Sequence, residues 1–364
     1  MRLTAALARM LPVFAVAVLV LSAGLTIAVA GDTFGFDFRA YHAAAARVLG
    51  GQRLYNLDYA VAGPYGLFLY PPTFLPFILP FGLLAATPAT WAWLVAMVAA
   101  FAATVALLPV SAQTRWLVVL LAGLSWPFVY NLKLGQVGPL LLLMFTIAWR
   151  WLDRPAAVGI VGAAGAAAKL QPGIILAWAL LTRRWAAAAI GVLVLLAFAA
   201  TATLLVGISA WTDFVTLIAR VSDPITTPHN FTPGAVAYQL GLPREAAAVL
   251  QLASSATVVV LVVVTALRLA AVPSYLVAVI ASQLLSPILW DHYALLLLLP
   301  VAWLLDRGRP WAVLFVLATP VFLVGSLPAW VYPLAFWACL LAVVAEGASE
   351  RRAARPAGAE PLAA

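Results

Sequence analysis

The sequence predicts an all-α polytopic membrane protein, in which about 11 to 13 transmembrane helices form one bundle over residues 1–345. Of the 364 residues, 66% are hydrophobic and only 9% are charged, whereas a soluble domain has about a quarter of its residues charged. The mean hydropathy is +1.08. The apolar runs show no sustained alternation with polar residues, which disfavours a β-barrel and favours helices. Lipid must therefore cover most of the surface.

The predicted spans are apolar runs bounded by charges, Pro or Gly. The first, Leu11–Ala30, follows Arg2 and Arg9 and ends in Ala-Val-Ala, which resembles a signal-peptidase site. Its length of about 20 residues favours a retained span with Gly31 outside. The later runs are Thr90–Val110, Trp116–Tyr130, Val137–Trp151, Pro155–Leu181, Trp185–Val206, Ala246–Leu267, Val272–Leu289, Tyr293–Leu305, Trp311–Gly325 and Ala329–Val344.

The net charge of +8 comes from 20 basic and 12 acidic residues. The basic residues form short clusters in alternate loops, as the positive-inside rule predicts for cytoplasmic loops. We therefore expect both termini in the cytoplasm and no nucleic-acid partner. The clusters are Arg150 with Arg154, Arg183-Arg184, Arg268, Arg307 with Arg309, and Arg351-Arg352.

The run Pro155–Leu181 lies between two of these clusters, so it must enter and leave the membrane on the same side. Lys169, Pro172 and Gly173 stand at its midpoint. This pattern predicts two short helices that meet at a polar tip on the outer side. The only cysteine, Cys339, lies in an apolar run, which excludes an internal disulfide framework and a thiolate metal cluster.

Two predicted outer segments, 31–69 and 207–245, are longer than simple connectors. The first contains an amphipathic stretch, Arg39 to Leu54, whose Tyr41 we expect to rest on the membrane surface. Four prolines disfavour a plain helix over Tyr70–Ala86, so this piece is predicted to be re-entrant or to lie along the outer surface. The polar segment 346–364 is predicted to be a disordered cytoplasmic tail.

Asp37 is the first candidate for chemistry. It stands among aromatic residues just after the first span, where partial desolvation raises the basicity of a carboxylate. Such a group suits the deprotonation of an acceptor hydroxyl. The alternative is structural, because a carboxylate is also favoured as the N-cap of a helix.

Other ionisable residues gather on the same predicted outer side. Lys169 lies in an otherwise uncharged run, where an ammonium group either binds a phosphate or snorkels to water. Lys133 with Gln136 admits the same two interpretations. His292 adds a titratable group beside Asp291, which is alternatively a helix cap, and His229 lies on a flexible loop.

Several site types are absent from the sequence. It contains no Gly-rich phosphate loop, no His-Glu-x-x-His and no Gly-x-Ser-x-Gly motif. No Asp-x-Asp occurs, which argues against a metal-dependent sugar-nucleotide site. We therefore expect neither a metal nor a cofactor.

The run Asp37-Phe38-Arg39-Ala40-Tyr41, followed by Leu54-Tyr55, resembles the first outer loop of glycosyltransferase family 87. Four later motifs are similar to the family and follow in its order: Tyr70-Pro71-Pro72, Gly135-Gln136, Lys169-x-x-Pro172 before Arg183-Arg184-Trp185, and Ser286-Pro287 before Trp290-Asp291-His292. Where the family often has Asn after Gly-Gln-x, this chain has Gly138. That departure concerns acceptor specificity more than chemistry.

The resemblance implies a GT-C fold and a mannosyltransferase that uses a polyprenyl-phosphate-sugar donor and a lipid or glycan acceptor. It implies inverting transfer at the outer face of the bacterial inner (plasma) membrane, with Asp37 as general base. Lys169, Lys133, His292 and Arg39 are the candidates for holding the donor phosphate. Tyr41, Gln136, Asp291 and His229 are further site candidates.

A transporter or lipid flippase without transferase activity is the main alternative, and a catalytically inactive assembly protein is another. Transporters place polar residues near the middle of the bilayer and often contain repeats. Here the polar groups gather at one predicted face and no repeat is evident. The sequence therefore favours an enzyme.

Overall fold

The computed structural model describes residues 5–57, 66–221, 223–318 and 327–353, and within these ranges every regular element is a helix. This confirms the predicted fold class. The α-helices are α1 (Ala5–Ala30), α2 (Phe36–Leu49), α3 (Leu75–Ile78), α4 (Ala86–Leu107), α5 (Ala112–Leu124), α6 (Trp126–Leu134), α7 (Gly138–Arg150), α8 (Pro155–Ala168), α9 (Ile174–Leu181), α10 (Trp185–Val206), α11 (Ser209–Val221), α12 (Pro233–Gln239), α13 (Arg244–Arg268), α14 (Ala271–Leu284), α15 (Leu298–Asp306), α16 (Val313–Leu317) and α17 (Val331–Ala353). The 3-10 helices are η1 (Gly31–Thr33), η3 (Pro72–Phe74), η4 (Leu79–Leu83), η5 (Gln171–Gly173), η6 (Asp291–Leu297) and η7 (Pro310–Ala312).

Fewer helices are long enough to span a membrane than the sequence led us to expect. By length and composition, five helices among the described residues qualify, or six if α5 and α6 form one span bent by 64°. Five further apolar helices are only 10–17 residues long. Pro and Gly explain much of this difference, because Pro127 follows the bend and a 3-10 turn at Gln171–Gly173 divides the run 155–181.

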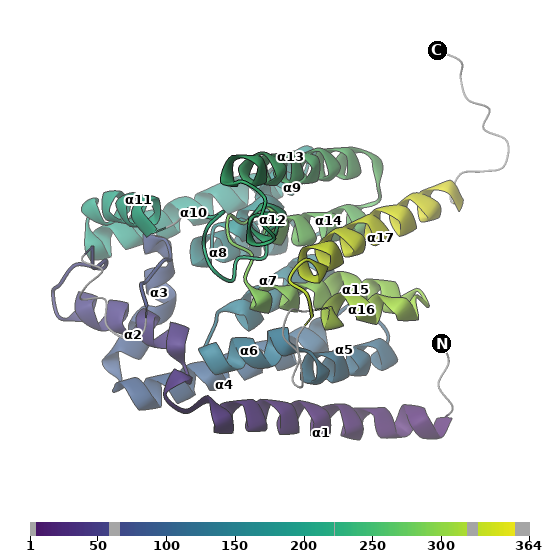
Figure 1. Cartoon of the computed structure of the whole chain (residues 1–364), viewed down its shortest axis with the longest axis horizontal. Coiled ribbons are helices and arrows are strands. Elements are labelled where there is room, and N and C mark those ends of the chain that lie inside the picture. The colour runs from purple at the N-terminus through teal and green to yellow at the C-terminus, as the bar shows by residue number, and fades with distance from the viewer. Residues whose placement is uncertain (1–4, 58–65, 222, 319–326, 354–364) are drawn as a thin grey trace, which may run out of the picture.

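Several basic loops of the chain meet at one end of the bundle. In Figure 1 the N-terminal end of α1 and the C-terminal end of α17 lie at one end of the long axis, and α2, α3 and α11 lie at the other. Hydrogen bonds join the basic loops to one another at the first end: Arg150 reaches the Leu107 carbonyl, Arg184 the Leu152 carbonyl, and Arg351 the Arg268 carbonyl. We call this the basic end, and the opposite one the α2 end.

Helix α17 runs further than the sequence predicted. It continues to Ala353, so residues 346–353 are helical where we expected a disordered tail, and 354–364 lie outside the described residues. Two ion pairs hold this extension: Glu346 binds Arg309 at 3.0 Å and Glu350 binds Arg307 at 2.5 Å. Glu346 and Glu350, which we expected in the disordered tail, thus pair with the arginines of the loop after α15.

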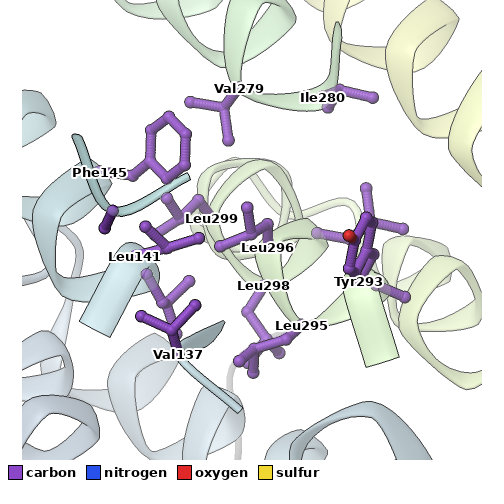
Figure 2. Packing of buried hydrophobic residues seen from close by; sticks show 14 of the residues in the cluster. Val137, Leu141, Phe145, Val279, Ile280, Tyr293, Leu295, Leu296, Leu298 and Leu299 are labelled. Carbon is purple, nitrogen blue, oxygen red and sulfur yellow. The ribbon is translucent and has the colours of Figure 1, made fainter. Parts of the chain in front are cut away.

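An apolar core lies between α7, α14 and the η6–α15 segment. Val137, Leu141 and Phe145 follow one face of α7, and Figure 2 shows them packed against side chains of the other two elements, including Val279, Leu296 and Leu299. All of these side chains are buried. The core fixes the start of η6, which carries Asp291 and His292, against the start of α7.

The first outer segment differs from expectation at Tyr41. This residue is fully buried in an aromatic cluster rather than resting on the membrane surface, because α2 packs on η4 and α4. The second long segment, 207–245, contains the helices α11 and α12. The proline-rich segment forms only the short pieces η3, α3 and η4, as its four prolines predicted.

Helices α8 and α9 form the predicted hairpin, and α8 also packs closely on α10. A Cβ added to Gly159 of α8 would lie 2.4 Å from the Ala187 carbonyl of α10, and one added to Gly191 would lie 2.4 Å from Leu176 of α9. Small residues of this kind let helix backbones approach closely where no water drives association. The hairpin tip, which carries Lys169, depends on this packing.

We expect Gly159→Val to lower the free energy of unfolding by about 1–3 kcal/mol, because the added side chain meets backbone atoms that have no rotamer to move to. Thermal unfolding in detergent measures this effect. Gly24→Val is the matched control, since a Cβ at Gly24 of α1 meets nothing within 4 Å. Equal melting temperatures for the two variants would contradict the close approach of α8 and α10.

Candidate active site

The candidate site begins where α2 meets the end of α6. Gly35 precedes α2 with φ of +70°, and its N–H donates to the Lys133 carbonyl at 2.7 Å. Gly135 ends α6 with φ of +68°, and a Cβ there would lie 2.6 Å from Cβ of Phe38. Both conformations favour glycine. This joint places Gln136, the next residue, against the first turn of α2.

Asp37 stands in that first turn and accepts a hydrogen bond from Nε2 of Gln136 at 2.6 Å. The N-cap residue of α2 is Gly35, and no side chain caps the helix. The capping alternative for Asp37 is therefore wrong. The side chain is half-buried and bonds to a residue 99 positions away.

Burial raises the pKa of the Asp37 carboxyl above its ordinary value. His292, the Gln136 hydrogen bond and Lys169 act in the opposite direction, and Asp291 raises the pKa slightly further. The net shift is upward, so the carboxylate is a stronger base than an exposed aspartate. The structure also brings four of the predicted residues, Gln136, Lys169, Asp291 and His292, within electrostatic reach of Asp37.

Tyr41 and Tyr70 complete the surroundings of Gln136. The Tyr70 hydroxyl donates to Oε1 of Gln136 at 3.0 Å, and the Tyr41 hydroxyl lies 2.7 Å from that of Tyr70 and 3.2 Å from the same Oε1. Tyr55 donates to the Tyr70 carbonyl at 2.7 Å and fixes the segment. We did not single out Tyr70 as a site residue, although its Tyr-Pro-Pro motif marked the segment.

Lys169 follows α8 at the tip of the hairpin. Its Nζ lies 3.9 Å from the ring centroid of Tyr293 and 5.8 Å from that of Tyr70. The side chain is half-buried and lies on two aromatic faces, which attract a cation. Gln171 in the same tip donates to the Ser286 hydroxyl at 2.7 Å and links the hairpin to the segment before η6. Lys169 is thus held inside the site rather than extended to the solvent.

Asp291 and His292 begin η6. The N-cap of η6 is Trp290, and the Asp291 carboxylate accepts from Nε1 of Trp126 at 3.1 Å, so the capping alternative is wrong for Asp291 too. Nδ1 of His292 lies 3.7 Å from Asp291. Nε2 of His292 is buried with no hydrogen-bond partner among the described residues. This nitrogen is available to a bound group.

A small cavity lies beside these groups. Its lining includes Asn131, Gln136, Lys169, His292 and Tyr293. Asn131 is fully buried and its Nδ2 donates to the His292 carbonyl at 2.9 Å, while its Oδ1 has no partner in the described part of the chain. Asn131 was missed from the sequence, although it stands only five residues before Gln136.

The other candidates lie at the margin of the site. Nζ of Lys133 lies 5.4 Å from the Tyr130 ring, whose centroid is 6.1 Å from that of His292. Arg39 turns toward the end of α1, where Nη1 donates to the Asp32 carbonyl at 3.4 Å. His229 is exposed on the loop before α12 and is not brought to the site. Its neighbour Asn230 anchors that loop by donating to the Pro287 carbonyl.

The cluster therefore combines one basic carboxylate with an ammonium group, a histidine and a polar cavity at the α2 end. No three His, Cys, Asp or Glu side chains gather into a potential metal site in the described ranges. A carboxylate of raised pKa can accept a proton from a hydroxyl, and the neighbouring cations can stabilise an anion that develops beside it.

The chain is similar in sequence to known glycosyltransferases. The model of glycosyltransferase family 87 matches residues 68–290, a range that includes Gln136 and Lys169. The polyprenol-phosphate-mannose-dependent alpha-(1-2)-phosphatidylinositol pentamannoside mannosyltransferase of Mycobacterium tuberculosis (strain CDC 1551 / Oshkosh) is 31% identical over 358 residues, which cover 86% of this chain and 80% of the relative. No solved structure matches the chain. The family match confirms the resemblance seen in the sequence: this multi-pass membrane protein belongs to glycosyltransferase family 87.

Proposed function

We propose that this protein transfers mannose from a polyprenyl-phosphate donor to a lipid or glycan acceptor, with inversion at the anomeric carbon and with Asp37 as general base. One observation carries the proposal: a half-buried carboxylate of raised pKa lies beside Lys169 and His292. The name of the mycobacterial relative supports the mannose donor and a phosphatidylinositol mannoside as the type of acceptor.

In the proposed reaction, the acceptor hydroxyl oxygen forms a bond to the anomeric carbon as the bond from that carbon to the phosphate oxygen breaks. The hydroxyl proton passes to the Asp37 carboxylate. The bonding electron pair leaves with polyprenyl phosphate, which is a stabilised anion. A single carboxylate suffices for such a displacement, because the leaving group needs no proton.

Lys169 and His292 are the proposed partners of the departing phosphate. The Lys169 ammonium is fixed over Tyr293, and Nε2 of His292 is buried without a partner among the described residues. Groups held in place before the reaction stabilise developing charge without reorganising. Lys133, whose Nζ lies 5.4 Å from the Tyr130 ring, adds a second ammonium group at the margin of the site.

The α2 end is proposed to face outward from the bacterial inner membrane. The basic end carries Arg150, Arg154, Arg184, Arg268 and Arg307, and loops rich in Lys and Arg stay in the cytoplasm. The gathering of the polar site groups at one end of the bundle favours an enzyme over a transporter, whose polar groups lie near the middle of the membrane.

The first test of the proposal is Asp37→Asn. We expect transfer to fall by roughly 100-fold or more, because the amide cannot accept the proton. Stability should change little, since the Asn side chain keeps an oxygen for the Gln136 hydrogen bond. Transfer by purified protein in liposomes, at saturating donor, measures the effect.

Asp32→Asn is the matched control, because Asp32 is an exposed carboxylate in η1, five residues upstream, and should leave the rate unchanged. A fully active Asp37→Asn enzyme would remove Asp37 from the mechanism and would direct attention to Asp291.

The second test is Lys169→Met, which keeps the length of the side chain and removes its charge. Transfer at limiting donor should weaken by roughly 1–3 kcal/mol, the range for losing a hydrogen bond to a charged group. Donor titrations of kcat/KM measure the loss. Arg53→Met, at an exposed cation of the segment 31–69, is the control. Unchanged donor kinetics for Lys169→Met would mean that Lys169 only packs on the aromatic rings.

A further inference from the structure

The hydrogen bonds around Gln136 have a fixed direction. Gln136 is 7% exposed, so its amide must find its partners inside the protein. A tyrosine hydroxyl carries one proton, and an amide oxygen can only accept. In this network Tyr70 donates to Oε1, the Tyr41 hydroxyl lies within hydrogen-bonding distance of the same oxygen, and the amide nitrogen faces Asp37.

This direction has a consequence for Asp37. The amide nitrogen only donates, so Oδ2 of Asp37 must accept. A protonated carboxyl still accepts at its carbonyl oxygen, but a hydrogen bond to an ionised carboxylate is shorter and stronger. The series of hydrogen bonds from Tyr41 to Tyr70, from Tyr70 to the amide oxygen, and from the amide nitrogen to Oδ2 therefore favours the ionised form of Asp37.

The same chain also fixes which oxygen is available for chemistry. Oδ2 is engaged by Gln136 at 2.6 Å, and no described residue donates to Oδ1. The close contact at Gly35 and Gly135 fixes the distance between the backbones of α2 and α6. The side chains of Asp37 and Gln136 are therefore held within reach of each other. Tyr55, through the Tyr70 carbonyl, prevents the tyrosine from turning away.

We infer that Gln136 is a positioning residue for the proposed base: its amide, oriented by Tyr41 and Tyr70, holds Asp37 ionised and with Oδ1 available to the acceptor hydroxyl. This inference rests on the proposed function, and it assigns to three buried residues a role beyond packing. Gln136 acts through Asp37 and need not touch either substrate.

Other charged and titratable groups face Asp37 and must be kept constant in any test. They come from several neighbouring elements. Asp291, His292 and Tyr293 belong to η6, Lys169 follows α8, and Tyr130 belongs to α6. Tyr41 and Tyr70 are the two tyrosines that bond to Gln136. The Gln136 hydrogen bond lowers the pKa of Asp37 against the effect of burial. Its loss therefore moves that pKa further upward.

The test is the pH profile of kcat, measured on liposome-reconstituted protein at saturating donor and acceptor. Because the base works only when ionised, activity falls as the pH drops through the pKa of Asp37. In Gln136→Leu the acidic limb should move by about one pH unit or more toward neutral pH, as expected for losing a hydrogen bond to a charged group. Tyr70→Phe keeps the ring and should move the limb in the same direction by less.

Gln251→Leu is the matched control, because Gln251 is a half-buried amide of α13 that bonds to the Gly234 N–H and to the Ser255 hydroxyl and not to Asp37. Its acidic limb should match that of the unmodified protein. If Gln136→Leu does not fold, the pH profile of Tyr70→Phe alone tests the inference. An unchanged limb in the folded variants would overturn the inference and reduce the network to packing.

The two proposals fail in different ways. If Asp37→Asn is inactive and Gln136→Leu keeps the normal limb, Asp37 remains the base and only the positioning role of Gln136 is lost. If Asp37→Asn is active, the acidic limb belongs to another group and the proposed function itself loses its base.

Discussion

The close joint between the start of α2 and the end of α6 is the constraint on which the rest of the site depends. The Gly35 N–H and the Lys133 carbonyl meet at 2.7 Å, and Gly135 packs without a Cβ against Phe38. Trp93 of α4 adds a hydrogen bond to the Gly135 carbonyl at 2.8 Å. Three elements far apart in the sequence thereby converge on one point. Gln136 follows immediately and reaches Asp37 because this point is fixed.

Separate packing contacts bring the other residues of the site, Lys169 and His292, close to this joint. The glycine-lined contact of α8 with α10 supports the hairpin tip and brings Lys169 over Tyr293. The apolar core between α7 and α14 holds η6, and with it His292, against Asn131. Lys169, His292 and Asp37 thus come from different elements, and separate packing contacts anchor each of these elements.

Much of this arrangement was accessible from the sequence. Composition gave the fold class, and the isolated charge of Lys169 in an apolar run marked it as a site residue. The exact match of α10 to the run Trp185–Val206 shows that hydropathy locates long spans well. The polar residues near Asp37 were predicted one by one, but their mutual contacts were not.

The failures have a common physical cause. Hydropathy does not distinguish a helix that faces lipid from one that faces protein, so Tyr41 was placed on the membrane surface although it is buried in aromatic rings. Hydropathy also cannot reveal partners distant in sequence, such as Arg309 for Glu346 or Tyr70 for Gln136. Nor does hydropathy show that the apolar run Trp116–Tyr130 is divided between α5 and α6 by a bend of 64°.

The central claim is that a single carboxylate drives a direct displacement at the anomeric carbon. Asp37 bonds to Gln136 and Asp291 to Trp126, so the two aspartates of the candidate site have different partners. The most direct measurement is the anomeric configuration of the transferred sugar, determined by NMR on the donor and on the product. One displacement predicts opposite configurations in the two compounds. Retention of configuration would contradict the account, because it requires a second nucleophile.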